Sequence, residues 1–198
     1  MCQQRPLHQK IMKILLSYLL FVLLLPDSVR EMRVNSSKTQ LTIYGTSSIH
    51  DWEIEAKNCS GIATVVFQNE SVSSIDRLSF KVAVASLESG KSAMDANTVE
   101  ALKGDEYPFI TYDLVDIKAI KKDGEKTFLN AIGTLSIAGA SRRVNMEIIT
   151  EGNEASLVIS GEVKLKMTDF KVDPPTAIFG TITTGDAITI KFKTNYIH

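Results

Sequence analysis

The chain has 198 residues, of which 44% are hydrophobic and 23% are charged, and its formal net charge is −1. This length gives a single domain enough interior for a core that needs no disulfide bonds. A charge so close to zero supplies no long-range attraction for nucleic acid, and there is no cluster of basic residues, so we expect no nucleic-acid binding.

The first 28 residues have the pattern of a secretory signal peptide. Three basic residues precede a mostly apolar run at 14–25, and a proline ends it. A membrane span needs about 20 such residues, so this run is too short for a comfortable span. We therefore expect residues 1–28 to be removed and residues 35–198 to form the folded domain. The mature protein would be periplasmic or secreted, without a membrane span; an uncleaved N-terminal anchor is the alternative.

Beyond this segment, apolar and polar residues alternate with a period of two along most of the chain. Leu41 and Ile43, for example, alternate with Thr42 and Tyr44, as expected of a strand with one buried and one solvated face. Short turn-forming links between these stretches favour antiparallel neighbours. The predicted strands cover 40–45, 51–56, 62–67, 78–84, 110–114, 127–137, 144–148, 157–165 and 188–192.

One segment departs from this pattern and predicts a short helix. Residues 93–103 are rich in helix formers, and Ser92 to Asp95 resembles a capping box with Asp in place of Glu. The expected domain is thus all-β, with eight or nine antiparallel strands and one short helix. Its strands can hide their apolar faces by closing into a barrel or by stacking as two sheets. An eight-stranded barrel is either filled by its own side chains or holds one small ligand.

A loop of about 20 residues, rich in Pro and Gly, separates the last two predicted strands, whereas most connections run about 4–6 residues. Loops of this length often cover or gate a site. Met167, Phe170 and Phe179 lie in it. They either form an apolar lid over a cavity or plug the end of the barrel as ordinary core, and both interpretations stay open.

Few side chains suit catalysis. His50 and Asp51 are adjacent, but neighbours on a strand point to opposite faces, so this carboxylate cannot readily orient this imidazole. Of the three histidines, one is in the predicted signal and one is the last residue, so no zinc site is expected. Cys59 is the one cysteine beyond residue 28, and nothing near it in sequence would activate a thiol. The sequence has neither a Gly-x-Ser-x-Gly elbow nor a phosphate-binding glycine loop. We therefore predict no catalytic residue, metal or cofactor.

Several separated motifs occur in a defined order. They are Gly45-Thr-Ser-Ser-Ile-His-Asp-Trp52, then Met94-Asp95 with Tyr107-Pro108, and finally Leu165-Lys-Met-Thr-Asp-Phe170 followed by Pro174-Pro175 and Gly185-Asp186. In these motifs the chain resembles the YceI-like family of lipid-binding proteins, over nearly everything from Lys38 to Phe192. The resemblance implies a lipocalin-like barrel whose cavity holds a long apolar chain such as a polyisoprenoid.

The favoured hypothesis is therefore a non-catalytic periplasmic or secreted carrier whose partner is an apolar lipid, an isoprenoid or a quinone. A closed barrel would turn the apolar strand faces inward, with His50 at the cavity or its rim. One alternative is an enzyme acting on an isoprenoid-like substrate with His50 as acid or base. The other is a plugged barrel that serves as an interaction or stress module. The predicted ligand-binding residues are His50, Trp52, Phe80, Tyr112, Met146, Ile159, Met167, Phe170 and Phe179.

Overall fold

The computed structural model describes residues 27–177 and 180–198. The predicted signal peptide therefore lies, up to residue 26, outside the described residues. In the described part the chain forms twelve strands and one α-helix, with three short 3-10 turns: η1 (Ser36–Lys38), η2 (Val84–Ser86) and η3 (Met167–Phe170). The helix α2 spans Ser92–Ala101, and the strands are β1 (Ser28–Val34), β2 (Gln40–Ser47), β3 (Asp51–Ala56), β4 (Cys59–Gln68), β5 (Ser71–Ala83), β6 (Leu87–Glu88), β7 (Phe109–Asp123), β8 (Lys126–Ile137), β9 (Ala140–Gly152), β10 (Ser156–Lys166), β11 (Thr176–Ala177) and β12 (Ile182–Ile197).

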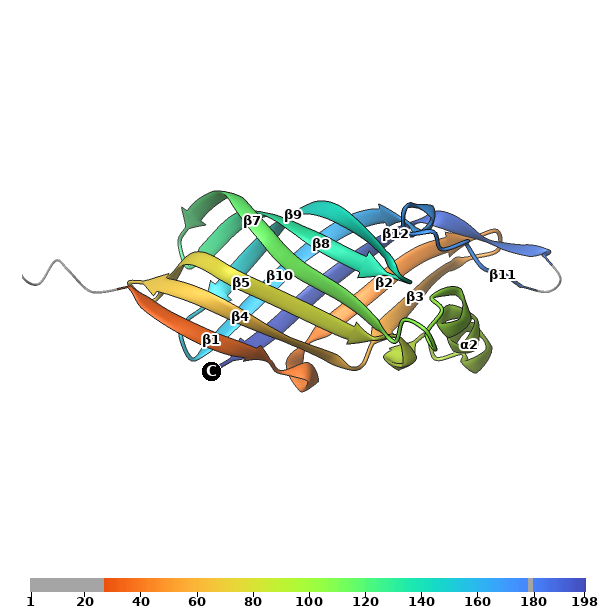
Figure 1. The fold of residues 1–198 in the computed structure, drawn as a ribbon, viewed down its shortest axis with the longest axis horizontal. Coiled ribbons are helices and arrows are strands. Elements are labelled where there is room, and N and C mark those ends of the chain that lie inside the picture. The colour runs from red at the N-terminus through yellow and green to blue at the C-terminus, as the bar shows by residue number, and fades with distance from the viewer. Residues whose placement is uncertain (1–26, 178–179) are drawn as a thin grey trace, which may run out of the picture.

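The antiparallel sheet closes into a barrel, because β12 pairs with β10 on one edge and with β1 on the other. The ring runs β1, β4, β5, β7, β8, β9, β10, β12 and back to β1. The predicted all-β, eight-stranded lipocalin-like barrel with one short helix is thus confirmed (Figure 1). Closure pairs both edges of every strand in the ring over part of its length, which removes the exposed edges that invite aggregation.

Three neighbouring strands of the barrel are each interrupted at the same level. β1 and β2 lie end to end along one edge of β12, with η1 between them. β4 and β3 follow β1 and β2 in the same way and are separated by residues 57–58, and β6 continues β5 beyond η2. We call this line of interruptions, formed by η1, residues 57–58 and η2, the seam. When each interrupted pair is counted as one strand of the wall, the barrel has eight strands, and β11 lies outside this count.

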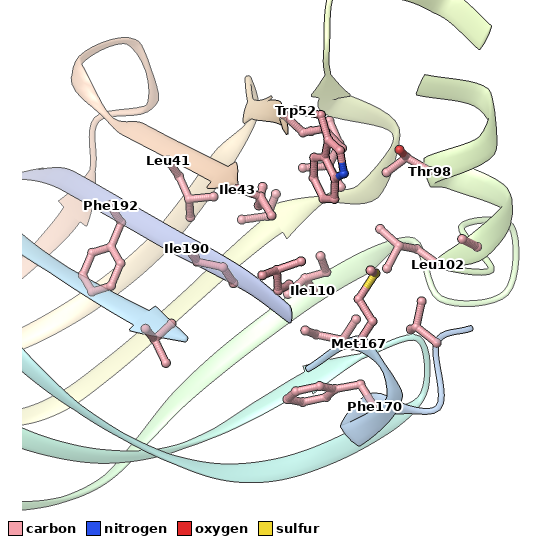
Figure 2. A pocket seen from close by; sticks show the side chains of 18 of the residues that line it. Leu41, Ile43, Trp52, Thr98, Leu102, Ile110, Met167, Phe170, Ile190 and Phe192 are labelled. Carbon is pink, nitrogen blue, oxygen red and sulfur yellow. The ribbon is translucent and has the colours of Figure 1, made fainter. Parts of the chain in front are cut away.

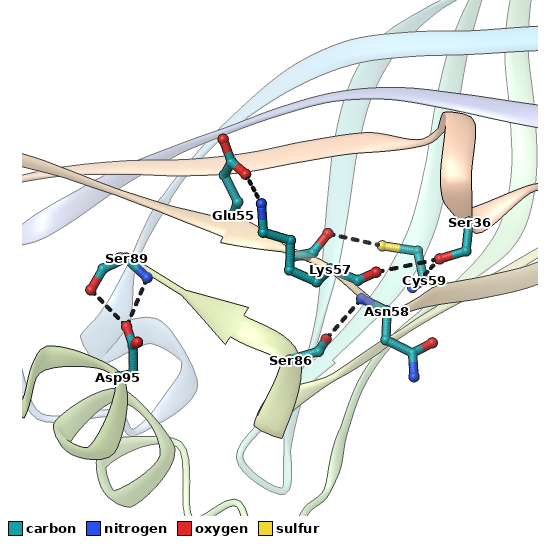
Figure 3. Close-up of polar contacts among 9 residues, drawn as sticks. Ser36, Glu55, Lys57, Asn58, Cys59, Ser86, Ser89 and Asp95 are labelled. Carbon is teal, nitrogen blue, oxygen red and sulfur yellow. Dashed lines mark hydrogen bonds and ion pairs between the residues drawn. The ribbon is translucent and has the colours of Figure 1, made fainter. Parts of the chain in front are cut away.

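Serine side chains pair the backbone groups that the seam leaves free (Figure 3). Ser36 Oγ accepts a hydrogen bond from the Cys59 backbone N–H at 3.2 Å. Ser86 Oγ accepts one from the Asn58 N–H at 3.0 Å and donates to the Ala83 carbonyl at 2.8 Å. An unpaired backbone N–H or C=O group that is shielded from water lowers the stability of the fold. These serines therefore allow the strands to be interrupted without leaving such groups unpaired.

Side chains fill the barrel at one end only. Met32, Phe67 and Tyr196 are at most 1% exposed and belong to a cluster at the end where β1 begins. At the other end, where α2 lies, two separate clusters line a cavity, and Leu102 and Ile110 pack against both. One is built around Phe170 and Leu135, and the other around Ile54 and Val82. The barrel is therefore solid at one end and hollow at the other.

The predicted helix is present, but it starts differently from the prediction. Lys91 occupies the N-cap position, and no side chain caps the helix. Asp95 instead accepts hydrogen bonds from the backbone N–H and the hydroxyl of Ser89, at 2.7 and 2.6 Å. These bonds hold the pKa of the Asp95 carboxyl below its usual value. The capping box predicted at Ser92 to Asp95 is thus wrong, because Asp95 ties the helix to the segment before it.

The sequence pattern did not predict β1, which begins at Ser28, ahead of the expected domain start at residue 35. Arg30 hides the alternation, because it takes a position on the inward side of the strand. It lies at the barrel end, where its guanidinium pairs with Glu154 at 2.7 Å. Both side chains stay partly exposed there, 41% for Arg30 and 34% for Glu154, so the inward position leaves the charges in contact with water.

The predicted long loop is shorter than expected. β12 begins at Ile182, and β11 pairs with its first residues. The register shifts between Thr184 and Ile188, which marks a bulge. Ile182, Thr184 and Ile188 all line the cavity, so the alternation keeps its phase through the bulge. Gly185 and Asp186 are turn-forming residues, and they made the first part of this strand read as a loop.

Replacing Ser86 with alanine should lower the free energy of unfolding by about 1 kcal/mol, because it removes the two hydrogen bonds that the Ser86 hydroxyl makes with Asn58 and Ala83. Ser136→Ala is the matched control, since Ser136 bonds only Ser141 on the exposed surface, and it should change stability by less than about 0.5 kcal/mol. Urea denaturation of both variants measures the difference. Equal stabilities would contradict a structural role for the seam serines.

Candidate functional site

The hollow end of the barrel contains a cavity of about 620 Å³. Side chains from the strand walls, from α2 and from η3 converge on it, and Leu41, Ile43, Ile110 and Ile190 are among its apolar walls (Figure 2). Small-molecule sites are typically concave and mostly apolar with a few polar groups, and their volumes run from about 300 to 1,000 Å³. This cavity fits that description and is the candidate functional site.

The structure brings most of the predicted ligand-binding residues together around this cavity. Phe179 lies outside the described residues, and contact between the others and a ligand stays a prediction. Their convergence follows from the period of two, which turns alternate residues of every strand inward once the barrel closes. The lining includes His50, Trp52, Phe80, Tyr112, Met146, Ile159, Met167 and Phe170.

Trp52 lies flat against the wall near the mouth. Its partner across the β2–β3 pair is Gly45, and a Cβ at Gly45 would come within 3.0 Å of three Trp52 ring atoms. The indole Nε1 donates a hydrogen bond to the Thr46 carbonyl at 2.9 Å. The ring is thus held at its edge by this bond and lies on a residue without a side chain.

Tyr112 is arranged in the same way deeper in the cavity. Its ring covers Gly133 of β8, where an added Cβ would also lie within 3.0 Å of three Tyr112 side-chain atoms. Its hydroxyl oxygen is buried and has no hydrogen-bond partner among the described residues. Burial raises the pKa of Tyr112 to about 12. The ring, and not the hydroxyl, is therefore the part that lines the cavity.

The mouth combines polar side chains with an exposed apolar one. His50 lies in the turn between β2 and β3, not on a strand as predicted, and its Nδ1 is 2.8 Å from the Asp51 carbonyl oxygen. The adjacent Ile49 is 61% exposed. Lys91 is the one charged residue of the described lining, which contains no Asp, Glu or Cys.

The loop after β10 contributes a fixed wall. Phe170 is 2% exposed and packs with Leu135, Val144 and Val172, so it belongs to the core as well as to the cavity lining. Asp186 accepts hydrogen bonds from the Thr168 backbone N–H and hydroxyl at 2.9 and 2.8 Å, which fixes η3. These bonds hold the pKa of Asp186 below its usual value.

The sequence analysis missed the part of the lining that α2 supplies. Met94, Thr98 and Leu102 all face the cavity. Their spacing of four residues places them on one side of a helix, and this spacing could have identified them. Figure 2 shows Thr98 and Leu102 on the side of the cavity that α2 covers, and Leu102 also packs against the cluster that contains Phe170.

Other chemistry has little support in the described part of the chain. No group of three His, Cys, Asp or Glu residues there is placed to hold a metal ion. Cys59 is 3% exposed, and burial raises the pKa of its thiol to about 11, so the sulfur stays protonated at neutral pH. Within residues 27–177 and 180–198, no helix is long and apolar enough to cross a membrane.

A profile of the YceI-like domain matches residues 31–196. BcnA of Burkholderia cenocepacia has a similar structure, with 20% identity, a TM-score of 0.65, and coverage of 82% of this chain and 98% of BcnA. A polyisoprenoid binding domain from Saccharophagus degradans, implicated in plant cell wall breakdown, has 9% identity and a TM-score of 0.64, with coverage of 86% and 99%. The Campylobacter jejuni YCEI protein has 22% identity and a TM-score of 0.58, with coverage of 73% and 84%. The search of curated proteins gives no match.

Tyr112→Phe should raise the free energy of unfolding by about 1 kcal/mol, because it removes a buried hydroxyl that lacks a partner. Thr194→Val is the matched control: the buried Thr194 hydroxyl donates a hydrogen bond to the Ile159 carbonyl at 2.9 Å, so its removal should lower stability by about 1 kcal/mol. Urea denaturation distinguishes the two signs. A clear loss of stability in Tyr112→Phe would show that its hydroxyl has a partner in solution, such as a buried water.

Proposed function

The chain belongs to the family of YceI-like domains, and on that premise we propose that it is a non-catalytic carrier of one isoprenoid-type lipid or quinone. The observation that carries the proposal is the apolar cavity of about 620 Å³ at one end of a closed barrel. The similar domain from Saccharophagus degradans is a polyisoprenoid binding domain, which supports the same class of ligand here.

Burial of the ligand's apolar surface would drive binding. Each methylene transferred from water to an apolar environment contributes about 0.8 kcal/mol. The walls offer branched aliphatic and aromatic side chains, and Met146 and Met167 add flexible, polarisable ones that adapt to an irregular chain. A chain of several isoprene units would therefore gain more than enough to be held against water.

The polar residues of the mouth would hold the ligand's head group. His50 and Lys91 lie there together with Asn97 and Thr98 of α2. They offer hydrogen-bond donors and acceptors on one side of an otherwise apolar chamber. An isoprenoid would then enter with its chain toward the filled end and its head at the rim.

The geometry favours binding over catalysis. The His50 ring faces a backbone carbonyl, and the described lining supplies no carboxylate that could orient it as an acid or base. A nucleophilic serine or threonine needs a base within hydrogen-bond reach, and Thr98 instead donates to the Met94 carbonyl at 2.9 Å. The hollow end likewise argues against a plugged barrel that serves only as an interaction module.

We further propose that the protein is exported, so that it would act in the periplasm or outside the cell. The basic residues before the apolar run at 14–25 support this. β1 begins at Ser28 and supplies Met32 to the core, so a cut just before Ser28 would keep the whole barrel.

N-terminal sequencing of the exported protein should find its first residue at Asp27 or Ser28, because later cuts would remove residues of β1. The comparison is between the soluble exported fraction and the membrane fraction. Intact residues 1–26 on protein recovered from membranes would replace this prediction with an N-terminal anchor.

An organic extract of the purified mature protein should contain an isoprenoid lipid or quinone, as measured by mass spectrometry. After the lipid is stripped, a polyprenyl compound should change Trp52 emission in a saturable way, because the ring lines the cavity. Met146→Lys should abolish the change, since it places an unpaired charge among apolar walls.

Asn145→Lys is the matched control for that titration. Asn145 precedes Met146 on β9 and is exposed on the outer face, so the same charge placed there should leave binding intact. A folded Met146→Lys protein that binds as well as Asn145→Lys would show that this cavity is not the binding site. Circular dichroism verifies that both variants are folded.

A further inference from the structure

Three aromatic rings of the cavity wall lie on glycines of neighbouring strands. Trp52 covers Gly45, and Tyr112 covers Gly133. Phe192 of β12 faces Gly161 of β10, where an added Cβ would lie 2.8 Å from the ring. All three rings line the cavity. A wide aromatic side chain thus occupies little of the interior wherever its neighbour has no side chain.

A Cβ on Gly45 or Gly133 would need room that only the cavity can supply, whereas a Cβ on Gly161 would also lie 2.9 Å from the Glu147 backbone carbonyl oxygen. Ordinary contact begins at 3.4 Å, and real Cβ atoms essentially never come within 3.0 Å of another atom. At Gly45 and Gly133 the three nearest atoms all belong to the ring, so the ring has to move and not the backbone. Each ring has the sheet on one face and the cavity on the other. An added Cβ would therefore push the ring toward the cavity and narrow it.

We propose that Gly45 and Gly133 set the width of the cavity, and that this width makes the protein select methyl-branched isoprenoid chains over unbranched chains of equal carbon number. The inference rests on the proposed lipid-binding function and specifies which shape of chain the cavity accepts.

The reason is packing. A methyl branch widens a chain at regular intervals, and the space above the flat rings takes up that width. An unbranched chain in the same chamber leaves voids along its length, and wall atoms facing a void lose their dispersion contacts. Conversely, a ring that has swung inward clashes with the branches first, because overpacking of an apolar interior is costly.

Gly139 provides an internal comparison. It also lies under an aromatic ring, that of Tyr107, and an added Cβ would come within 3.0 Å of that ring. Neither residue lines the cavity. The φ angle of Gly139 is +77°, so Gly139→Ala also strains the backbone. It therefore displaces a ring and destabilises the fold without changing the width of the chamber.

The test measures competition between two alcohols with the same head group and the same carbon number, farnesol and pentadecan-1-ol. Stripped protein is incubated with equal amounts of both and repurified, and the bound alcohols are quantified after extraction. The two alcohols differ in where their carbons lie and not in how many they have, and a misfit the size of one methylene in an apolar pocket changes affinity about 10–200-fold. The unmodified protein should accordingly retain farnesol at least about tenfold in excess.

Gly133→Ala should lower this ratio at least about tenfold, within the same range of effects. Adding Tyr112→Leu to Gly133→Ala should restore the ratio, because no ring is then left to displace. Gly45→Ala, with Trp52→Leu as its restoring change, is the second pair. Gly139→Ala should leave the ratio unchanged while lowering the melting temperature.

The outcomes separate this inference from the function on which it rests. If the unmodified protein retains neither alcohol, the proposed lipid binding fails, and the inference fails with it. If it retains both without preference, lipid binding stands and selection by width is overturned. That result needs no variant, so the test holds even if a glycine substitution prevents folding. A Gly133→Ala protein that keeps the original ratio would also overturn the inference.

Discussion

The whole structure depends on the closure of one antiparallel sheet through β12. This strand of sixteen residues pairs with β10 along one edge, while its other edge is shared between β1 and β2. Closure turns one face of every strand into an interior, and that interior has to be filled by side chains or by something else. Here both solutions occur in one barrel, with a packed core at one end and a chamber at the other. The chamber begins where the packed core around Met32, Phe67 and Tyr196 ends.

Most of the barrel could be predicted from the sequence, because the alternation of apolar and polar residues is visible within each strand. When the sheet closes, the apolar residues of all strands point into one interior. Met146 and Ile159 lie on different strands, yet both line the cavity for this reason. The signal failed where individual residues hide it. Arg30 takes an inward position on β1 and pairs with Glu154, which is far away in sequence. Gly185 and Asp186 read as a turn, although the bulge there keeps them within β12. Neither the partner nor the bulge can be recognised from a single strand.

The candidate site was predicted less completely than the fold. Alternation identified inward positions but said nothing about how a ring lies once it is inside. Whether Tyr112 projects into the chamber or lies against its wall depends on Gly133, a residue on another strand. The capping box was misassigned for a similar reason, because Ser89 competes for the same carboxylate. Contacts between segments that are distant in sequence decided these details.

Because of the seam, the two ends of the barrel differ in the free energy that local opening costs. Its three breaks interrupt the continuous hydrogen-bond ladders between the solid end and the short pieces β2, β3 and β6 around the mouth. Regions with fewer buried contacts open at lower free-energy cost than a packed core, and often as separate cooperative units. The mouth can then open locally while the packed end around Met32, Phe67 and Tyr196 keeps the barrel closed. A bulky chain could thus pass in or out by a local fluctuation, without global unfolding of the domain.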